Sequence, residues 1–129
     1  ADHIEQVGTE AFITEWLSRP MFSNLNSTPS DIHDRNRNTA TSLATSLRLA
    51  GTGAQQSLWG SLHLLDAPVL LIAGKQDQAF CNNAKRMKEL IGENATVAIV
   101  NNSGHSVHLE QLEDCAKIIM NWLDQQANR

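Results

Sequence analysis

The stretch Pro68-Val-Leu-Leu-Ile-Ala-Gly-Lys-Gln-Asp77 decides the fold of this 129-residue chain. Its unbroken apolar run is typical of a parallel strand that is buried on both faces of a sheet. A second apolar run, Ala95 to Val100, has the same character, and an amphipathic helix is predicted between the two runs, from Asn82 to Ile91. Because another helix is predicted from Gln111 to Gln126, the pattern indicates an α/β fold with two parallel βα units and a right-handed crossover.

The sequence before Pro68 differs in composition and periodicity. It is more polar, and its apolar residues recur at helical spacing. Its predicted elements are a helix at residues 9–18, a loop at 23–30, a helix at about 31–50 and a short helix around 55–62. We therefore expect two parts, residues 1–65 and residues 66–129. Two strands are too few for a stable parallel sheet, since each would keep an unpaired edge. We expect an absent N-terminal half or a second copy of the chain to supply the missing strands.

Composition and charge favour a globular domain over a nucleic-acid-binding or membrane-spanning protein. A hydrophobic fraction of 41% and a charged fraction of 19% are typical of a globular domain. The net charge of −4, without a basic cluster, makes nucleic acid an unexpected partner. No apolar run reaches the roughly 20 residues of a membrane helix, and the N-terminal sequence has no secretory pattern. Cys81 and Cys115 lack metal-type spacing and are expected to be free thiols of a cytoplasmic protein.

Asp77 and His105 are the candidate catalytic residues. Each follows an apolar run, so both are expected at the carboxyl end of the sheet, where open α/β sheets place their sites. Asp77 could orient a histidine, and His105 could transfer a proton near neutral pH. Their order matches the last two members of a Ser-Asp-His triad on an α/β-hydrolase sheet. The ordinary alternatives are a turn aspartate and a surface histidine.

Other polar residues give weaker signals. No Gly-x-Ser-x-Gly elbow occurs in the 129 residues, so the chain is interpreted as the C-terminal half of an enzyme that lacks its nucleophile. His108 and Glu110 are expected to open the final helix in structural roles, with Glu110 favoured by the helix dipole. Arg35 could clamp a carboxylate, although a lone arginine is ordinarily solvent-exposed. No histidine spacing predicts a metal site.

Several segments together resemble one known family, the 2-succinyl-6-hydroxy-2,4-cyclohexadiene-1-carboxylate synthases of menaquinone biosynthesis, which have the α/β-hydrolase fold. The residues that carry the resemblance are Trp16-Leu-Ser-Arg-Pro-Met-Phe-Ser-Asn-Leu, Arg35, Gly51-Thr-Gly-Ala-Gln-Gln-Ser-Leu-Trp59, Pro68-Val-Leu-Leu-Ile-Ala-Gly-Lys-Gln-Asp77-Gln-Ala-Phe80 and Gly104-His105-Ser-Val-His108-Leu-Glu110. The resemblance covers nearly the whole chain and the second half of the family's length. The Gly-x-x-Asp and Gly-His elements are general to α/β-hydrolases, whereas the tryptophan segment is more specific.

The resemblance implies a role for each matched residue. Asp77 and His105 would be the acid and the base of the triad, Trp16 and Phe80 would line the substrate pocket, and Arg35 would bind a substrate carboxylate. Residues 1–65 would be a helical cap with a connecting helix, and residues 66–129 the C-terminal part of the core. The reaction would be a lyase-type elimination of pyruvate from a small carboxylate, without a metal or an organic cofactor.

Two alternatives remain open at this point. One is a generic esterase or carbon–carbon hydrolase of the same fold, because the discriminating arginines mostly belong to the half that is absent here. The other is a non-catalytic chain that binds a partner. Because the family's serine and oxyanion donors also belong to that half, we expect the chain alone to be inactive.

Overall fold

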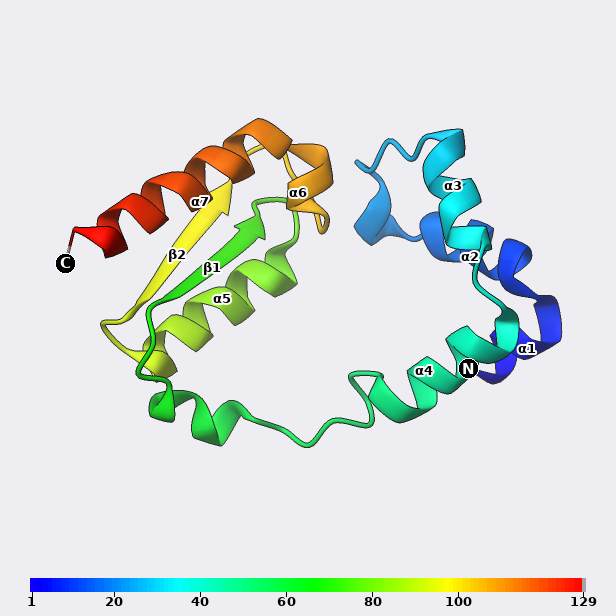
Figure 1. Cartoon of the computed structure of the whole chain (residues 1–129), viewed down its shortest axis with the longest axis horizontal. Coiled ribbons are helices and arrows are strands. Elements are labelled where there is room, and N and C mark those ends of the chain that lie inside the picture. Colours follow the sequence, from blue (N-terminus) through cyan, green and yellow to red (C-terminus); the bar gives the residue numbers. More distant parts are fainter. Residues whose placement is uncertain (129) are drawn as a thin grey trace. The chain divides into compact units, whose positions relative to one another are not determined.

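The computed structural model describes residues 1–128 and divides into two compact units, unit 1 at Ala1–Ser57 and unit 2 from Leu58 onward (Figure 1). The sequence predicted that residues 58–65 belong to the first part of the chain, whereas in the structure they belong to unit 2. The Arg86 guanidinium stacks on the ring of Trp59, 4.4 Å from its centroid, and Asn94 Nδ2 donates to the carbonyl of Leu65 at 2.6 Å. That residues 1–65 act as a cap stays a prediction.

Unit 1 is built from short helices. They are α1 Asp2–Val7, α2 Thr9–Leu17, the 3-10 helix η1 Pro20–Phe22, α3 Pro29–Asn36 and α4 Ala40–Ala50. Helix α1 is an addition to the predicted elements. Gly8 separates it from α2 with φ of 83°, a left-handed conformation that glycine adopts without steric cost.

The prediction of a single helix at residues 31–50 is wrong, because the structure has two helices, α3 and α4, in this region. Thr28 begins α3 early by accepting a hydrogen bond from the Asp31 amide at 3.2 Å, while Asp31 bonds back to the Thr28 amide. Asn38 then donates to the carbonyl of Arg35 at 2.9 Å, and Thr39 caps α4 by accepting from the Ser42 amide. Polar side chains that compete for backbone groups therefore divide the segment.

Arg48 ties the ends of unit 1 together. Its guanidinium donates to Glu5 Oε2 at 2.6 Å and to Asp2 Oδ1 at 2.5 Å, so that it joins α4 to α1. These hydrogen bonds from Arg48 hold the pKa values of Asp2 and Glu5 below their ordinary range. Aromatic rings also connect α2 to η1. The ring of Trp16 on α2 lies 5.9 Å, between centroids, from that of Phe12 on the same helix and 5.9 Å from that of Phe22 on η1.

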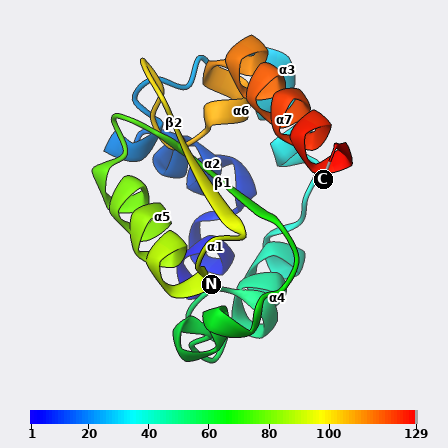
Figure 2. The same cartoon turned by 90° about the vertical axis from the view of Figure 1, so that its left-hand side faces the viewer.

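Unit 2 is a parallel βαβα arrangement with a helix on each face of the sheet. Its elements are η2 Trp59–Leu64, β1 Val69–Gly74, α5 Gln78–Ile91, β2 Ala95–Val100, α6 Val107–Glu110 and α7 Leu112–Ala127. Strands β1 and β2 pair in parallel from Val69↔Ala95 to Gly74↔Val100 (Figures 1 and 2). The two predicted strands and the crossover helix are confirmed, and each strand has one edge without a strand partner in the described part of the chain.

Alternate residues of the strands build two small cores. Ala73 and its neighbours Leu71, Val97 and Ile99 pack against Cys81 and Ala84 of α5. On the opposite face, Ile72 and Val100 pack with Val107, Cys115 and Ile118 of α6 and α7, and Figure 2 shows the strands between α5 and α7. This alternation is the period of two that a strand covered on both faces requires. Among residues 1–128, no helix combines the length and apolar character needed to cross a membrane.

The final helix differs from the expectation in its first turn. Glu110 was predicted to open it, but Glu110 is the last residue of the separate short helix α6, and α7 begins at Leu112. The break lies at Gln111, whose φ of −139° and ψ of 60° are not helical. The side chain of Gln111 donates to the carbonyl of Asn102 at 3.0 Å and so attaches this corner to the preceding loop.

The carboxyl ends of β1 and β2 are joined by further backbone hydrogen bonds. Beyond the sheet, the amide of Lys75 donates to the carbonyl of Val100 at 2.8 Å, and the amide of Gln76 donates to the carbonyl of Ser103 at 2.9 Å. Gly74 lies so close to this second loop that an added Cβ would overlap the carbonyl oxygens of Ser103 and Gly104. The close approach of the two loops therefore requires glycine at position 74.

Replacement of Gly74 by alanine should separate the two loops. We expect Gly74→Ala to lower the free energy of unfolding by about 1–3 kcal/mol, since backbone atoms must move to accept the methyl group. Denaturant titration measures the change. Gly60→Ala is the matched control, because a Cβ at Gly60 meets no atom within 4 Å. Equal effects of the two substitutions would contradict the steric argument.

The Arg48 cluster should give unit 1 a pH-dependent stability. We expect Arg48→Gln to lower the thermal midpoint, whereas Arg37→Gln, whose partner Asp34 is 3.8 Å away, should change it less. Because the carboxylate pKa values are lowered in the folded state, the contribution is full above their ordinary values and is lost as pH falls through the lowered ones. The difference between wild type and Arg48→Gln should therefore shrink in acid, and a constant difference would contradict this.

Candidate functional site

Asp77 and His105 meet at the carboxyl end of the sheet. Asp77 Oδ2 lies 2.8 Å from His105 Nδ1, within hydrogen-bonding distance. A carboxylate only accepts hydrogen bonds, so Nδ1 carries the proton and proton exchange with a reactant falls to Nε2. The two side chains are partly buried, with 13% of Asp77 and 26% of His105 exposed. This arrangement is suited to general base chemistry.

Asp77 is fixed by the helix that it begins. Its Oδ1 accepts a hydrogen bond from the amide of Phe80 at 3.1 Å, so Asp77 is the N-cap of α5 while Oδ2 faces His105. Its own amide donates to the carbonyl of Gly74 at 3.0 Å. The backbone amide of Asp77 therefore closes a tight turn, while its carboxylate starts a helix and orients a histidine, which leaves the side chain little rotational freedom.

Phe80 lies against the histidine. The ring centroids of Phe80 and His105 are 4.6 Å apart with an interplanar angle of 75°, an edge-to-face contact. Phe80 is 49% exposed, so one side of its ring packs on the imidazole and another part faces outward. Its proximity to His105 is compatible with the predicted pocket-lining role, which stays a prediction.

The loop that carries His105 is held by a residue for which the sequence suggested a different role. Glu110 Oε2 accepts from the amide of Gly104 at 2.6 Å, and Glu110 Oε1 accepts from the amide of Ser106 at 2.9 Å. These are the peptide groups on either side of His105. The sequence offered only the short spacing between Glu110 and His105 as a signal, because the contact depends on the turn that α6 makes.

The other predicted site residues, Trp16 and Arg35, belong to unit 1. Trp16 stacks on Phe12 and carries the Arg19 guanidinium 4.5 Å from its ring centroid, a cation–π contact. Arg35 is half-buried in the last turn of α3. The substrate-binding roles predicted for Trp16 and Arg35 stay predictions.

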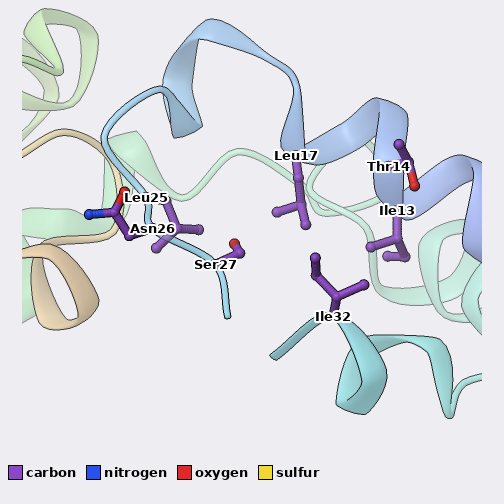
Figure 3. A pocket seen from close by; sticks show the side chains of 7 residues that line it. All are labelled: Ile13, Thr14, Leu17, Leu25, Asn26, Ser27 and Ile32. Carbon is purple, nitrogen blue, oxygen red and sulfur yellow. The ribbon is translucent and has the colours of Figure 1, made fainter. Parts of the chain in front are cut away.

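A cavity in unit 1 is a second candidate site. It has a volume of about 370 Å³, and Figure 3 shows Ile13 and Leu17 of α2 and Ile32 of α3 directed into the same space as Leu25. Asn26, Ser27 and Thr14 complete its lining, so none of the lining residues is charged. The lining therefore offers no cationic side chain that would pair with a carboxylate. Within residues 1–128, no cluster of His, Cys, Asp or Glu is arranged to hold a metal ion.

Comparison with known proteins finds similar chains among curated proteins and among solved structures. The chain is 38% identical over 128 residues to a Bacillus subtilis (strain 168) protein named "Putative 2-succinyl-6-hydroxy-2,4-cyclohexadiene-1-carboxylate synthase", and the match covers 95% of this chain and 46% of that protein. The solved structure of MenH from S. aureus matches with a TM-score of 0.89 and 27% identity, over 97% of this chain and 49% of the other. No family model matches the sequence.

These matches confirm the resemblance and the fold class that the sequence predicted. The chain spans about half the length of the curated relative and of the solved structure that it matches. Its two strands, their flanking helices and the Asp77–His105 pair have the topology expected for the last part of an α/β-hydrolase fold. The chain is thus related, over nearly all of its length, to the 2-succinyl-6-hydroxy-2,4-cyclohexadiene-1-carboxylate synthases of the α/β-hydrolase superfamily.

Proposed function

We propose that this chain is the second half of a menaquinone-pathway synthase that eliminates pyruvate from a cyclohexene carboxylate. In this proposal Asp77 and His105 are the acid and the base of a Ser-Asp-His triad, and the serine lies in the part of the family's length that the chain does not cover. The observation that carries the proposal is the 2.8 Å hydrogen bond between Asp77 and His105. The relatedness to a synthase of that name selects the reaction.

The proposed chemistry is proton abstraction followed by elimination. The serine hydroxyl, deprotonated by His105 Nε2, removes a proton next to a carbonyl of the substrate, and the electron pair forms an enolate-type intermediate. That electron pair then forms a carbon–carbon double bond as the carbon–oxygen bond to the leaving group breaks. The enolate that departs takes up the proton held on His105 and becomes pyruvate. Asp77 stabilises the imidazolium that forms while the proton resides on His105. Cationic and amide donors stabilise the negative charge that develops on the substrate.

Three further residues complete the proposed site. Arg35 binds a carboxylate of the substrate through its planar guanidinium, and Trp16 lines the pocket. Phe80 closes the pocket beside His105, which its 4.6 Å ring contact with that histidine supports. The proposal requires no metal or organic cofactor. It places the protein in the cytoplasm, and it requires the N-terminal half of the fold, or a second copy, to complete the sheet.

The first test concerns His105. A chimera joins the first half of the Bacillus subtilis relative to this chain, and pyruvate release is measured on the synthase substrate. We expect activity in the chimera and none in the 129-residue chain alone, which has no elbow serine. His105→Ala should lower kcat by about 10²–10⁴-fold, the contribution of a positioned base.

His108→Ala is the matched control for this test. His108 is an exposed histidine three positions further along the same segment, and its replacement should leave kcat within a few-fold of the parent chimera. If both substitutions have equally small effects, His105 is not the base. If the chimera cleaves simple esters and leaves the synthase substrate unchanged, the generic hydrolase is the better description.

The second test concerns Arg35 and uses the same chimera. Arg35→Lys keeps the charge but loses the two parallel hydrogen bonds of a guanidinium–carboxylate pair. We expect kcat/KM to fall by about 10- to 100-fold, the value of one hydrogen bond to a charged group. Arg37→Lys is the control, because Arg37 is exposed and lies 3.8 Å from Asp34, its ion-pair partner.

The comparison of the two arginines separates the candidate functions. A large effect at Arg35 and a small effect at Arg37 supports a carboxylate clamp in the cap. Equal and small effects would remove that role from Arg35. They would also favour the esterase or carbon–carbon hydrolase, whose substrates need no carboxylate clamp.

A further inference from the structure

The carboxylate of Glu110 bridges the two peptide groups that flank His105. Oε2 accepts the Gly104 amide at 2.6 Å, and Oε1 accepts the Ser106 amide at 2.9 Å. Each oxygen has its own donor, so the contact is two-pronged. Hydrogen bonds to an ionised acceptor are shorter and stronger than those between neutral groups, which the 2.6 Å distance reflects.

Burial makes these two hydrogen bonds necessary. Gly104 and Ser106 are both buried, and a buried amide without a partner is strongly unfavourable. The neighbouring carbonyls of the loop already have other partners, since Ser103 accepts from the Gln76 amide and Asn102 accepts from the Gln111 side chain. Glu110 therefore supplies the acceptors for the part of the loop that carries His105.

The helix-dipole role suggested by the sequence does not account for this geometry. Glu110 is the last residue of α6, the end at which a negative charge is unfavourable. Its carboxylate faces the loop at Gly104 and Ser106, while the first turn of α7 has its own acidic residues, Glu113 and Asp114. The location of Glu110 is explained by the loop that it holds.

We propose that Glu110 is the positioning residue that fixes the backbone of His105, so that the imidazole stays in line with Asp77. Asp77 holds the side chain through Nδ1, and Glu110 holds the peptide on both sides of the same residue. Glu110 acts through His105 and does not touch the reactant. The consequence for catalysis rests on the proposed function, in which His105 is the base, whereas the structural role does not.

The test of the structural role uses the 129-residue chain and NMR. The Nδ1 proton of His105, shared with Asp77, should give a downfield resonance that disappears in His105→Ala, which assigns it. Glu110→Gln keeps the size of the side chain but replaces one acceptor by a donor. We expect this variant to lose the resonance through exchange with solvent while the amide signals of β1 and β2 keep their positions. Glu113→Gln, an exposed glutamate on α7, is the matched control and should keep it.

Two further measurements keep the test decisive if Glu110→Gln unfolds. In the wild-type chain, the amides of Gly104 and Ser106 should exchange with solvent at least about tenfold more slowly than unbonded loop amides. Glu110→Asp retains the charge but is too short to reach both amides, and it should also lose the His105 resonance. Unprotected Gly104 and Ser106 amides, or an undiminished resonance in either folded Glu110 variant, would overturn the proposal.

The catalytic consequence is measured in the chimera. Glu110→Gln should lower kcat by about 10²-fold, the effect of a small misplacement of a catalytic group, with KM little changed. A rise in KM with kcat unchanged would overturn the positioning role. If the chimera lacks synthase activity but the resonance still depends on Glu110, the proposed function fails and the positioning of His105 by Glu110 stands.

Discussion

The parallel pairing of β1 and β2 is the constraint on which the site depends. Because Gly74 and Val100 are opposite each other in the register, the two loops that follow begin at the same edge of the sheet. Two backbone hydrogen bonds then continue the pairing beyond the strands, from Lys75 to Val100 and from Gln76 to Ser103. A carboxylate in the first loop and an imidazole in the second are thereby brought within 2.8 Å of each other, although they are 28 positions apart in sequence.

Much of this arrangement follows from the sequence. Apolar runs without alternation predict strands covered on both faces, and consecutive parallel strands place their following loops together. The strands, the crossover helix and the proximity of Asp77 to His105 could therefore be predicted from residue order and hydrophobicity. The alternation of Leu71 and Ala73 with Ile72, which separates the two cores, is the structural basis of that pattern.

Features that depend on local hydrogen bonding could not be predicted in the same way. The break between α3 and α4 arises because Asn38 and Thr39 bind backbone groups at the two helix ends, and their sequence is equally compatible with one exposed helix. Glu110 lies in an acidic and polar stretch that suggests the start of a helix. Its real contacts appear only when the non-helical backbone at Gln111 separates α6 from α7 and turns the carboxylate toward Gly104.

Three residues that hold or contact His105 come from a short part of the chain. Asp77, Phe80 and Glu110 all lie in unit 2, on segments that follow or flank the two strands. The geometry of the Asp77–His105 pair is therefore determined by this part of the fold. In the proposed function, the nucleophile and the substrate contacts are contributed by other parts. Such pre-organisation is physically favourable for catalysis, because groups already aligned need little reorganisation when charge develops. If His105 is the base, as proposed, its fixation at the side chain and on both sides of its backbone meets that requirement more fully than a hydrogen bond to Asp77 alone.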